Sequence, residues 1–551
     1  MSLKPEPIPP IPKETKRIAK KAFPKGNIYM RMRDKLGTFY QDEQFASLFP
    51  ECGQPGYSPW RLALISVMQF IESLSDRQAA EAVRARIDWK YALSLELTDP
   101  GFDYSVLSEF RTRLLDGGTE QYLLDTMLDT FQEHNLLKER GKQRTDSSHV
   151  VAAIRTLNRL ENLGETLRTA LNSIAVADPE WLVQIAEPEW YDRYGKRIEE
   201  SRLPKGKDKR REYAEIIGVD GMKLLEAVYS DTVLEVLRQL PAVETLRQTW
   251  MHQYYMKEGQ LCLREARDLP SASLRSDSPY DPEAHYGTKG DIHWLGYKVH
   301  VTESCDVDAP HLITHVETTA APQGDVDMTE PIHEALADKG KLPGEHFLDG
   351  GYVDAELLLS SQSDYQVELV GPVKNDRHWQ VKESKGYAME NFDIDWEAKA
   401  VTCPQGNTTY DWVTTHDAKG NPTIRIRFAR SVCAACEVRS LCTRAVKDGR
   451  CLGLRANQAQ HEALREARQK QETPEWKKRY AKRAGIEGTI SQGTRAFELR
   501  QTRYIGLTKT HLQHILTAAA INIVRVDNWF TETPLAKTRT SRFKAIQPRA
   551  A

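Results

Sequence analysis

Apolar residues recur at helical spacing in the first quarter of the chain. The pattern starts near Tyr57 and continues through Leu62, Leu64, Ile65, Met68 and Ile71. Further helices are predicted to start near Ser75 and Asp103, because each is a capping residue type ahead of an apolar run. The pattern predicts a helical domain over residues 41–140, preceded by a loosely ordered basic arm over residues 1–40.

The pattern changes to β type at residues 141–155. Asp146 lies there among small polar and β-branched residues, ahead of an apolar run, so it is predicted to lie on or at the end of a short strand. Helical spacing returns over residues 156–285 and predicts a long helical insertion. Within that insertion Asp220 is expected to cap a helix, since a helical run follows it.

Residues 286–375 predict the main part of a mixed sheet. Two β-rich runs, Trp294–Thr302 and His311–Thr319, flank the turn-forming Asp308-Ala-Pro, which indicates a hairpin. Strands that alternate with helices after this hairpin place the chain in the α/β class, with helices flanking the sheet.

A second acid follows in this region. Asp349 comes directly after the apolar Phe347-Leu348 and before a Gly-Gly turn, so it is expected at the end of a strand. Asp354 is the expected N-cap of the next helix. A further strand is predicted over residues 365–373.

The last third of the chain begins with a Cys-rich insertion over residues 376–455. A basic helical segment is predicted over residues 456–530, and its apolar part, Thr510–Arg525, is expected to pack against the sheet. The tail at residues 531–551 is basic and predicted to be disordered.

Length and composition indicate a soluble protein with several domains. A chain of 551 residues exceeds one ordinary core. Hydrophobic residues at 40% and charged residues at 28% are typical of soluble globular domains. No signal peptide or membrane-spanning run is recognised, so a cytoplasmic protein without membrane association is expected.

The net charge of −2 conceals a segregated distribution. Residues 461–551 carry 18 Lys and Arg against 8 Asp and Glu, and residues 1–40 carry 10 against 3. Lys205–Arg211 adds a basic cluster. This distribution predicts a polyanionic partner, with a solvated surface as the plainer alternative. In the helical domain, Arg77 and Arg111 are expected to face DNA, as in a helix-turn-helix bundle.

Five of the eight cysteines fall between residues 403 and 451. The spacing Cys403-x29-Cys433-x2-Cys436-x5-Cys442 offers four thiolates for a tetrahedral Zn²⁺, and Cys-x2-Cys is a common half-site. Cys451 could replace Cys403 or Cys442 as a ligand. The favoured interpretation is a structural zinc site, and the alternative is a set of reduced cysteines in a small hairpin subdomain.

Three acids have settings that suit divalent-metal chemistry on phosphodiesters: Asp146, Asp349 and Glu487. Two strand carboxylates and one helix carboxylate can converge on two ions about 4 Å apart, and Mg²⁺ prefers such oxygen ligands. Taken singly, each acid has a plainer explanation, because Asp146 could cap a helix, Asp349 could stabilise a turn and Glu487 could lie on a surface.

Five motifs occur in one order along nearly the whole chain: Tyr57-Ser-Pro to Leu115, Thr145-Asp-Ser-Ser-His-Val150, Gly296-Tyr-Lys-Val-His-Val301, Asp349-Gly-Gly-Tyr352 and Arg503–His514. In this set the chain resembles bacterial insertion-sequence transposases with an RNase H-like catalytic domain, most closely the insertion-sequence 1182 family. The resemblance implies a DDE triad of Asp146, Asp349 and Glu487, which would hold two Mg²⁺ ions, with Mn²⁺ as a substitute.

The resemblance also implies the reaction and its DNA contacts. Such enzymes cut double-stranded DNA at terminal inverted repeats and transfer the released 3′-OH into target DNA. Tyr480 and Arg483 fit the family signature Tyr-x2-Arg-x3-Glu-x6-Lys around Glu487, but Thr494 stands at the Lys position and Arg495 follows it. Tyr480, Arg483 and Arg495 are therefore expected to lie against phosphates.

Lys298, beside the second strand, is expected to touch the DNA backbone. Pairing of two transposon ends implies a homodimer on DNA, in the bacterial cytoplasm and associated with the nucleoid. Two alternatives use the same features: a metal-dependent nuclease without strand transfer, and a domesticated, catalytically inactive DNA-binding protein. A zinc-ribbon interaction protein is a third, but the Cys-rich segment is too small a part of the chain to define it.

Overall fold

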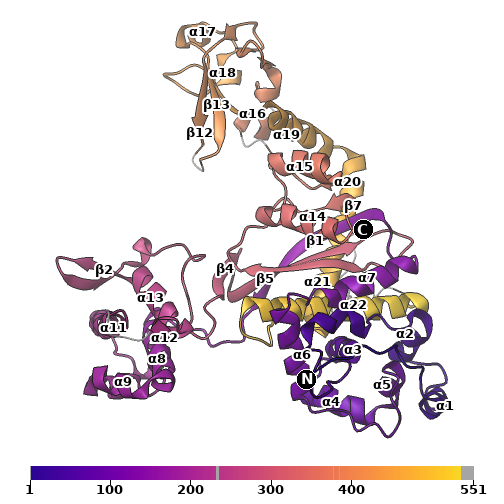
Figure 1. The fold of residues 1–551 in the computed structure, drawn as a ribbon. Helices are drawn as coiled ribbons and strands as arrows, with labels where there is room; N and C mark the ends of the chain where they lie inside the picture. Colours follow the sequence, from indigo (N-terminus) through magenta and orange to yellow (C-terminus); the bar gives the residue numbers. More distant parts are fainter. Residues whose placement is uncertain (1, 231–234, 376–377, 384, 418–419, 535–551) are drawn as a thin grey trace, which may run out of the picture. The chain divides into compact units, whose positions relative to one another are not determined.

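The computed structural model describes residues 2–230, 235–375, 378–383, 385–417 and 420–534 (Figure 1). The chain divides into two compact units. The first comprises the described residues of Met1–Lys138, Ser147–Gln323 and Glu487–Ala551, and the second those of Glu139–Asp146 and Gly324–Ile486. Most of the tail predicted at 531–551 lies outside the described residues.

The N-terminal part of the first unit is helical, as predicted. Its elements are α1 (Lys13–Ala22), α2 (Ile28–Leu36), the 3-10 helix η1 (Asp42–Leu48), α3 (Pro59–Ile71), α4 (Asp76–Ala85), α5 (Ile87–Ala92), α6 (Ser105–Asp116) and α7 (Tyr122–Glu133). The predicted start at Ser75 is confirmed, because its side chain and that of Gln78 form a reciprocal capping box at α4.

Residues 1–40 differ from the predicted arm. They contain α1 and α2, which bury Ala19 and Met30 in a small core with Tyr91. The Thr15 hydroxyl is also buried and donates to the Leu95 carbonyl at 2.8 Å. The basic side chains lie on the outer faces of short amphipathic helices, so the composition of this segment concealed its apolar stripe.

The long helix α22 (Leu507–Phe530) is buried along most of its length and packs on β6 (Ile313–Ala320), α2, α3 and α7. This confirms the apolar helix predicted at 510–525. Arg31 and Asp527 form an ion pair at 2.6 Å between α2 and α22. Among the described residues, none of the helices combines the length and the apolar character that crossing a bilayer requires.

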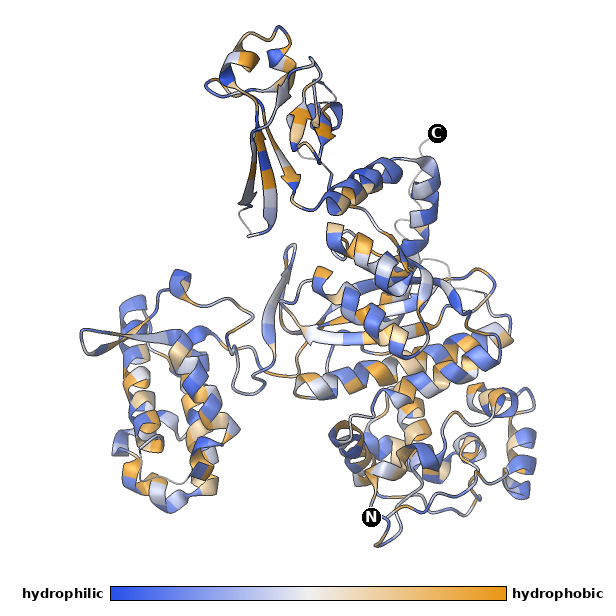
Figure 2. Cartoon of the chain, turned by 45° about the horizontal axis from the view of Figure 1, so that its top comes forward, coloured by the Kyte–Doolittle hydropathy of each residue, from blue (hydrophilic) through white to orange (hydrophobic). Residues whose placement is uncertain are grey.

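The predicted insertion is a helical bundle with its own core, which includes Leu163, Leu167 and Trp250 (Figure 2). Its elements are α8 (Arg159–Ala177), α9 (Pro179–Ile185), α10 (Pro188–Tyr194), η2 (Glu200–Arg202), α11 (Lys207–Val228), α12 (Glu235–Arg238), α13 (Pro241–Gln253), β2 (Tyr254–Lys257), β3 (Gln260–Leu263) and η3 (Ala266–Asp268).

Asp220 is not the helix cap that the sequence predicted. It lies inside α11, where it is buried. Its carboxylate accepts a hydrogen bond from the Tyr194 hydroxyl at 2.6 Å and pairs with Arg193 at 2.8 Å. The helix continues through Asp220 because these tertiary partners satisfy the carboxylate.

The chain forms a mixed sheet of six strands: β1 (Arg140–Val151), β4 (His285–Lys289), β5 (Ile292–Ser304), β6, β7 (Pro343–Phe347) and β8 (Glu368–Val370). The strand order is β4-β5-β1-β7-β8, and β6 also pairs with β5. The β4-β5 and β5-β6 pairs are antiparallel, which confirms the predicted hairpin, whereas β1-β7 and β7-β8 are parallel.

Helices of the second unit accompany β7 and β8: η4 (Val326–Met328), α14 (Thr329–Asp338), α15 (Ala355–Tyr365), α19 (Gln458–Gln471), α20 (Pro474–Tyr480) and η6 (Ala481–Ala484). Asp354 caps α15 as predicted, by accepting from the Glu356 and Leu357 amides at 2.9 Å. The strand predicted at 365–373 is shorter, since α15 extends to Tyr365. The helix α21 (Gly485–Ala496) begins in the second unit and continues in the first.

The Cys-rich segment contains two small three-stranded antiparallel sheets and short helices. The elements are α16 (Trp379–Lys382), η5 (Met389–Asn391), β9 (Asp393–Asp395), β10 (Ala400–Thr402), β11 (Thr408–Thr409), β12 (Trp412–His416), β13 (Pro422–Arg427), α17 (Arg430–Ala434), α18 (Arg439–Cys442) and β14 (Cys451–Arg455). Its apolar core includes Val401, Phe428 and Leu452.

Candidate active site

Two parallel strands bring Asp146 and Asp349 together. Arg144 on β1 is the register partner of Phe347 on β7. Asp146 and Asp349 each lie two residues further along, Asp146 within the longer strand β1 and Asp349 just after the end of β7, which runs in the same direction. The sequence predicted both settings but could not show that the two strands are neighbours.

Arg483 lies between these two carboxylates. Its Nη2 atom is 2.7 Å from Asp146 Oδ2 and 3.7 Å from Asp349 Oδ2. The exposed fraction of the side chain is 10% for Asp146 and 32% for Asp349. One guanidinium nitrogen therefore contacts both acids, which places their oxygens around a shared positive charge.

A close contact fixes the turn that carries Arg483. Arg144 Nη1 donates to the Lys482 carbonyl at 2.6 Å. A Cβ atom added at Gly485 would lie 1.9 Å from the Arg144 guanidinium, so a larger residue there would displace the Arg144 side chain. Arg144 and Gly485 thus hold η6 beside β1.

A further acid, which the sequence analysis did not single out, lies close to the turn after β7. The Gly351 amide donates to Asp349 Oδ1 at 2.7 Å. A Cβ atom on Gly351 would lie 2.8 Å from Asp349 Oδ1 and 3.4 Å from Asp325 Oδ2, so both carboxylates lie close to this glycine. Asp325 precedes η4, and an acid is common at the start of a helix. The sequence around Asp325 therefore gave no sign of a functional role.

Two buried histidines join β1 to β7 next to Asp146. His346 Nε2 is 2.7 Å from Thr145 Oγ1, and His346 Nδ1 is 2.8 Å from His333 Nε2. Burial lowers the pKa of His333 to about 4 and holds the pKa of His346 well below its usual value. Both rings are therefore neutral at pH 7, and they support the strand pair that presents the aspartates.

Glu487 lies at the start of α21 and is exposed. In the first unit this helix is held by a buried acid that the sequence analysis missed. Glu303 on β5 is fully buried, and its Oε2 atom accepts from Thr489 Oγ1 at 2.5 Å and from Arg525 Nη1 at 2.6 Å. Arg525 Nη2 is also hydrogen-bonded to Thr489 Oγ1 at 2.6 Å. These contacts fix α21 two residues after Glu487.

The side chains predicted to face DNA have different surroundings. Arg77 is exposed and stacks on Tyr104, and Arg495 is exposed on α21. Arg111 is instead buried and pairs with Asp76 at 2.5 Å, so its guanidinium is committed inside the protein. The sequence could not indicate this burial, because an Arg on a helix looks the same in sequence whether it faces solvent or a carboxylate.

Two further predicted contacts are partly exposed. The Lys298 ammonium donates to the Gln323 carbonyl at 2.6 Å. Tyr480 stacks on Trp476, with 4.8 Å between the ring centroids.

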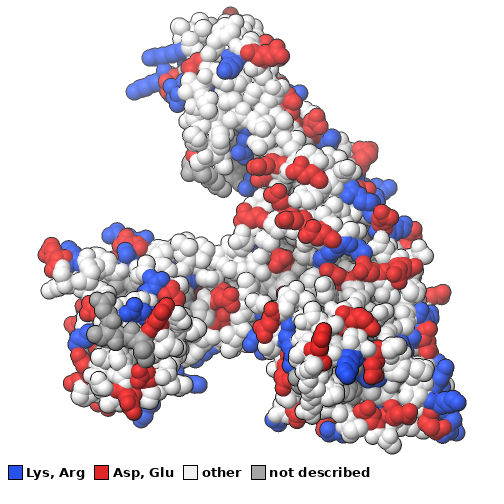
Figure 3. Space-filling model, in the orientation of Figure 1, with Lys and Arg blue, Asp and Glu red and all other residues white. Residues whose placement is uncertain are grey.

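The basic segments are interspersed with acids. In the cluster at Lys205–Arg211, Arg210 pairs with Glu200, and Arg211 lies 2.9 Å from Glu265. On the face shown in Figure 3, Lys and Arg side chains are intermixed with Asp and Glu side chains. The positive charge that is segregated along the sequence is therefore partly mixed with negative charge on the surface of the folded protein.

Four cysteines from separate turns line one small cavity of about 30 Å³: Cys403, Cys433, Cys436 and Cys442. Burial raises the pKa of Cys442, and the three neighbouring cysteines raise it further. Cys451 is exposed at the start of β14 and does not line this cavity. Within the described residues, no group of three or more His, Cys, Asp or Glu side chains is already arranged to hold a metal ion.

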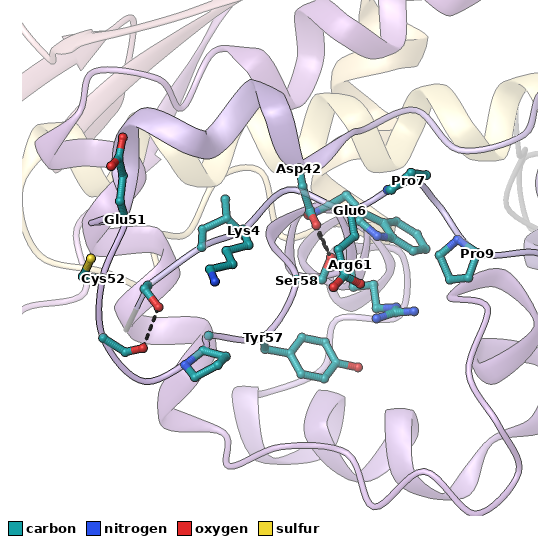
Figure 4. Close-up of a pocket in the computed structure, with 16 residues that line it drawn as sticks. Lys4, Glu6, Pro7, Pro9, Asp42, Glu51, Cys52, Tyr57, Ser58 and Arg61 are labelled. Atoms are coloured by element: carbon teal, nitrogen blue, oxygen red, sulfur yellow. Dashed lines mark hydrogen bonds between the residues drawn. The ribbon is translucent and has the colours of Figure 1, made fainter.

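A further cavity, of about 600 Å³, is lined by N-terminal residues and the start of α3 (Figure 4). The Ser58 hydroxyl donates to Asp42 Oδ1 at 2.8 Å in its wall. The Asp42 carboxylate also accepts from the Trp60 amide at 3.1 Å, so this acid serves the start of α3.

Two regions of the chain match known protein families. Residues 402–526 match a family described as transposase DDE domain, and residues 17–113 match one described as transposase domain (DUF772). Glu487 falls inside the first match, whereas Asp146 and Asp349 lie outside both. A comparison with curated proteins gave no match. The two family matches support an insertion-sequence transposase.

Proposed function

We propose that this protein is a DDE transposase that cuts DNA at the ends of an insertion sequence and joins those ends to target DNA. One observation carries the proposal: Asp146, on β1, and Asp349, just after the parallel strand β7, share the Arg483 guanidinium. Both family matches support it. The antiparallel hairpin and the parallel strands within one mixed sheet support an RNase H-like domain, and the insertion-sequence 1182 family remains our proposed assignment.

Asp146, Asp349 and Glu487 are the proposed ligands of two Mg²⁺ ions, with Mn²⁺ as a substitute. The donors fit, because carboxylate oxygens are hard ligands and the two aspartates already lie around a cationic group. When bound, a metal pair generates a nucleophile from water and stabilises charge on the phosphate. Asp146 and Asp349 would hold the metal ions, and Glu487, which follows Arg483 by about one helical turn, would complete the ligand set.

The proposed reaction has one hydrolysis and one transesterification. In the first step water attacks the phosphate at the transposon end, a P–O bond to the water oxygen forms, the P–O bond to the 3′ oxygen breaks, and a 3′-OH and a 5′-phosphate result. In the second step that 3′-OH attacks a phosphate of target DNA, and one P–O bond forms as another breaks, so no ATP is consumed. With a divalent cation held by the aspartates, the forked donors of Arg483 would contact a DNA phosphate.

The remaining contacts are assigned by exposure. Arg77 and Arg495 are proposed to bind the DNA backbone, with Lys298 and Tyr480 as partly exposed contributors. The terminal inverted repeats and the target are the proposed double-stranded partners. Pairing of two ends requires a homodimer in the DNA complex, and the bacterial cytoplasm, at the nucleoid, is the proposed location.

The test is an end-cleavage and strand-transfer assay with Mg²⁺ on DNA that carries both ends of the element. Wild-type protein is compared with Asp146→Asn, Asp349→Asn and Glu487→Gln. Asp354→Asn is the matched control, because this nearby acid caps a helix and asparagine can also cap. Wild type and the control should cut and join, while the three variants bind DNA and do neither.

The other outcomes separate the alternatives. Cutting without joining would identify a nuclease that uses the same acids. Binding of ends without any cutting would identify an inactive DNA-binding protein. Full activity of Glu487→Gln would remove this residue from the triad and leave the aspartate pair in place.

A further inference from the structure

We propose that Cys403, Cys433, Cys436 and Cys442 bind one zinc ion as a four-thiolate structural site. The four side chains line one cavity of about 30 Å³, which has room for a single ion. Tetrahedral coordination by four sulfur ligands is characteristic of structural Zn²⁺. The sequence left Cys451 as an alternative ligand, and its exposed position outside this cavity excludes it from the proposed set.

Backbone turns bring the four thiols to this point. Cys403 starts a tight turn after β10, in which the Gly406 amide donates to the Cys403 carbonyl at 2.8 Å and Gly406 has a φ of 78°. Cys433 and Cys436 lie on α17 and just after it, joined by a hydrogen bond from the Cys436 amide to the Cys433 carbonyl. Cys442 ends α18.

The surrounding donors suit thiolate ligands. The Arg450 backbone amide donates to Cys433 Sγ at 3.3 Å, a contact that orients this sulfur. The buried Arg450 side chain and Gln380 both donate to the Cys442 carbonyl at 2.8 Å, which fixes that ligand turn. Outer contacts of this kind orient the ligands of metal sites.

The size of the segment gives a reason for a metal. Its apolar core is small, and cysteines pack against that core from one side. Domains of this size commonly need a metal or another cross-link to be stable. The thiols are not yet gathered at coordination geometry, so binding would draw the side chains inward by rotation about their Cα–Cβ bonds.

The test measures metal content, which does not depend on DNA cleavage. Full-length protein is purified, stripped with a chelator, reloaded with Zn²⁺ alone and analysed by elemental mass spectrometry. Wild type and Cys451→Ser should each hold about one zinc per chain, whereas Cys433→Ser and Cys442→Ser should lose most of it. Absence of zinc from wild type, or equal loss from Cys451→Ser, would overturn the proposal.

A second measurement uses wild-type protein alone, so it tests the site even if the cysteine variants fail to fold. In wild type, Zn²⁺ should protect about four thiols from an alkylating reagent, and Co²⁺ in place of Zn²⁺ should give the absorption bands of tetrahedral thiolate coordination. Equal alkylation with and without zinc would contradict the site. Restoring Mg²⁺ alone after chelation should restore neither thiol protection nor the cobalt bands, which separates this site from the carboxylate site.

Discussion

Two acid–arginine clusters in this protein differ in how completely the carboxylates are satisfied. Glu303, in the first unit, is fully buried and accepts from both Thr489 and Arg525. In the second unit, Asp146 and Asp349 share a single guanidinium nitrogen of Arg483, and Asp349 is about one-third exposed. A fully buried acid with dedicated partners stabilises the fold, whereas two acids that share one cation can exchange that cation for another.

The largest expected effect is on catalysis. Asp146→Asn should lower single-turnover cleavage about 1000-fold, about 4 kcal/mol in activation free energy, because a metal ligand is lost. The free energy of unfolding should change far less than the activation free energy, because asparagine keeps the volume of the side chain and Arg483 still lies beside Asp349. Cleavage kinetics and urea denaturation measure the two quantities. A loss of stability as large as the loss of activity would break the comparison.

Glu303→Gln should lower the stability of the protein more than it lowers cleavage. Removal of the negative charge leaves Arg525 partly buried without its full counter-charge, which is expected to lower the free energy of unfolding by about 3 kcal/mol. Urea denaturation measures the loss, and the folded fraction should retain cleavage. Glu317→Gln is the control, because Glu317 is 32% exposed and lies 3.6 Å from His315. Equal losses in both variants would show that burial of Glu303 is not the cause.

The histidine pair below Asp146 makes stability dependent on pH. The pKa of His333 is about 4 in the folded protein and near 6.5 when unfolded, so the unfolded state binds more protons between these values. Stability should therefore fall on acidification, by about 2 kcal/mol from pH 7 to pH 5. Denaturation midpoints of wild type and His333→Gln at several pH values measure this change. In the variant, the free energy of unfolding should depend much less on pH. The same change at exposed His134 should leave the dependence on pH intact.

The smallest expected effect is on DNA binding, and it distinguishes exposed Arg77 from buried Arg111. Arg77→Ala should weaken DNA binding by about 1 kcal/mol and reduce the salt dependence by about one counterion, because one phosphate contact is lost. Arg111→Ala should instead lower thermal stability, since it leaves Asp76 without its partner. Binding titrations at several salt concentrations and melting curves distinguish them. An unchanged salt dependence in Arg77→Ala would remove this residue from the interface.

Much of the fold could be predicted from local pattern. The hairpin of β5 and β6, the strand around Asp146 and the helix at 510–525 have strong periodicity, and the structure contains all three. The helices within residues 1–40 were missed, because their basic composition outweighed a narrow apolar stripe. The cap predicted at Asp220 was wrong, because its partners Arg193 and Tyr194 come from another helix.

The candidate site was predictable only in its residue types. The settings of Asp146 and Asp349 could be recognised in the sequence, but the parallel pairing of β1 and β7 is a long-range property that local pattern does not contain. Asp325 and Glu303 were missed for the same reason. Asp325 resembles any acid before a helix, and nothing near Glu303 in the sequence indicates that Thr489 and Arg525 will meet it.

The long separation between Asp146 and Arg483 has a consequence during protein synthesis. A growing chain emerges from the ribosome with its N-terminal helices first and can fold them early. The strand partner of β1 and the arginine that joins the two aspartates emerge much later. A nascent or prematurely terminated chain would therefore hold the N-terminal helices without the cluster of Asp146, Asp349 and Arg483.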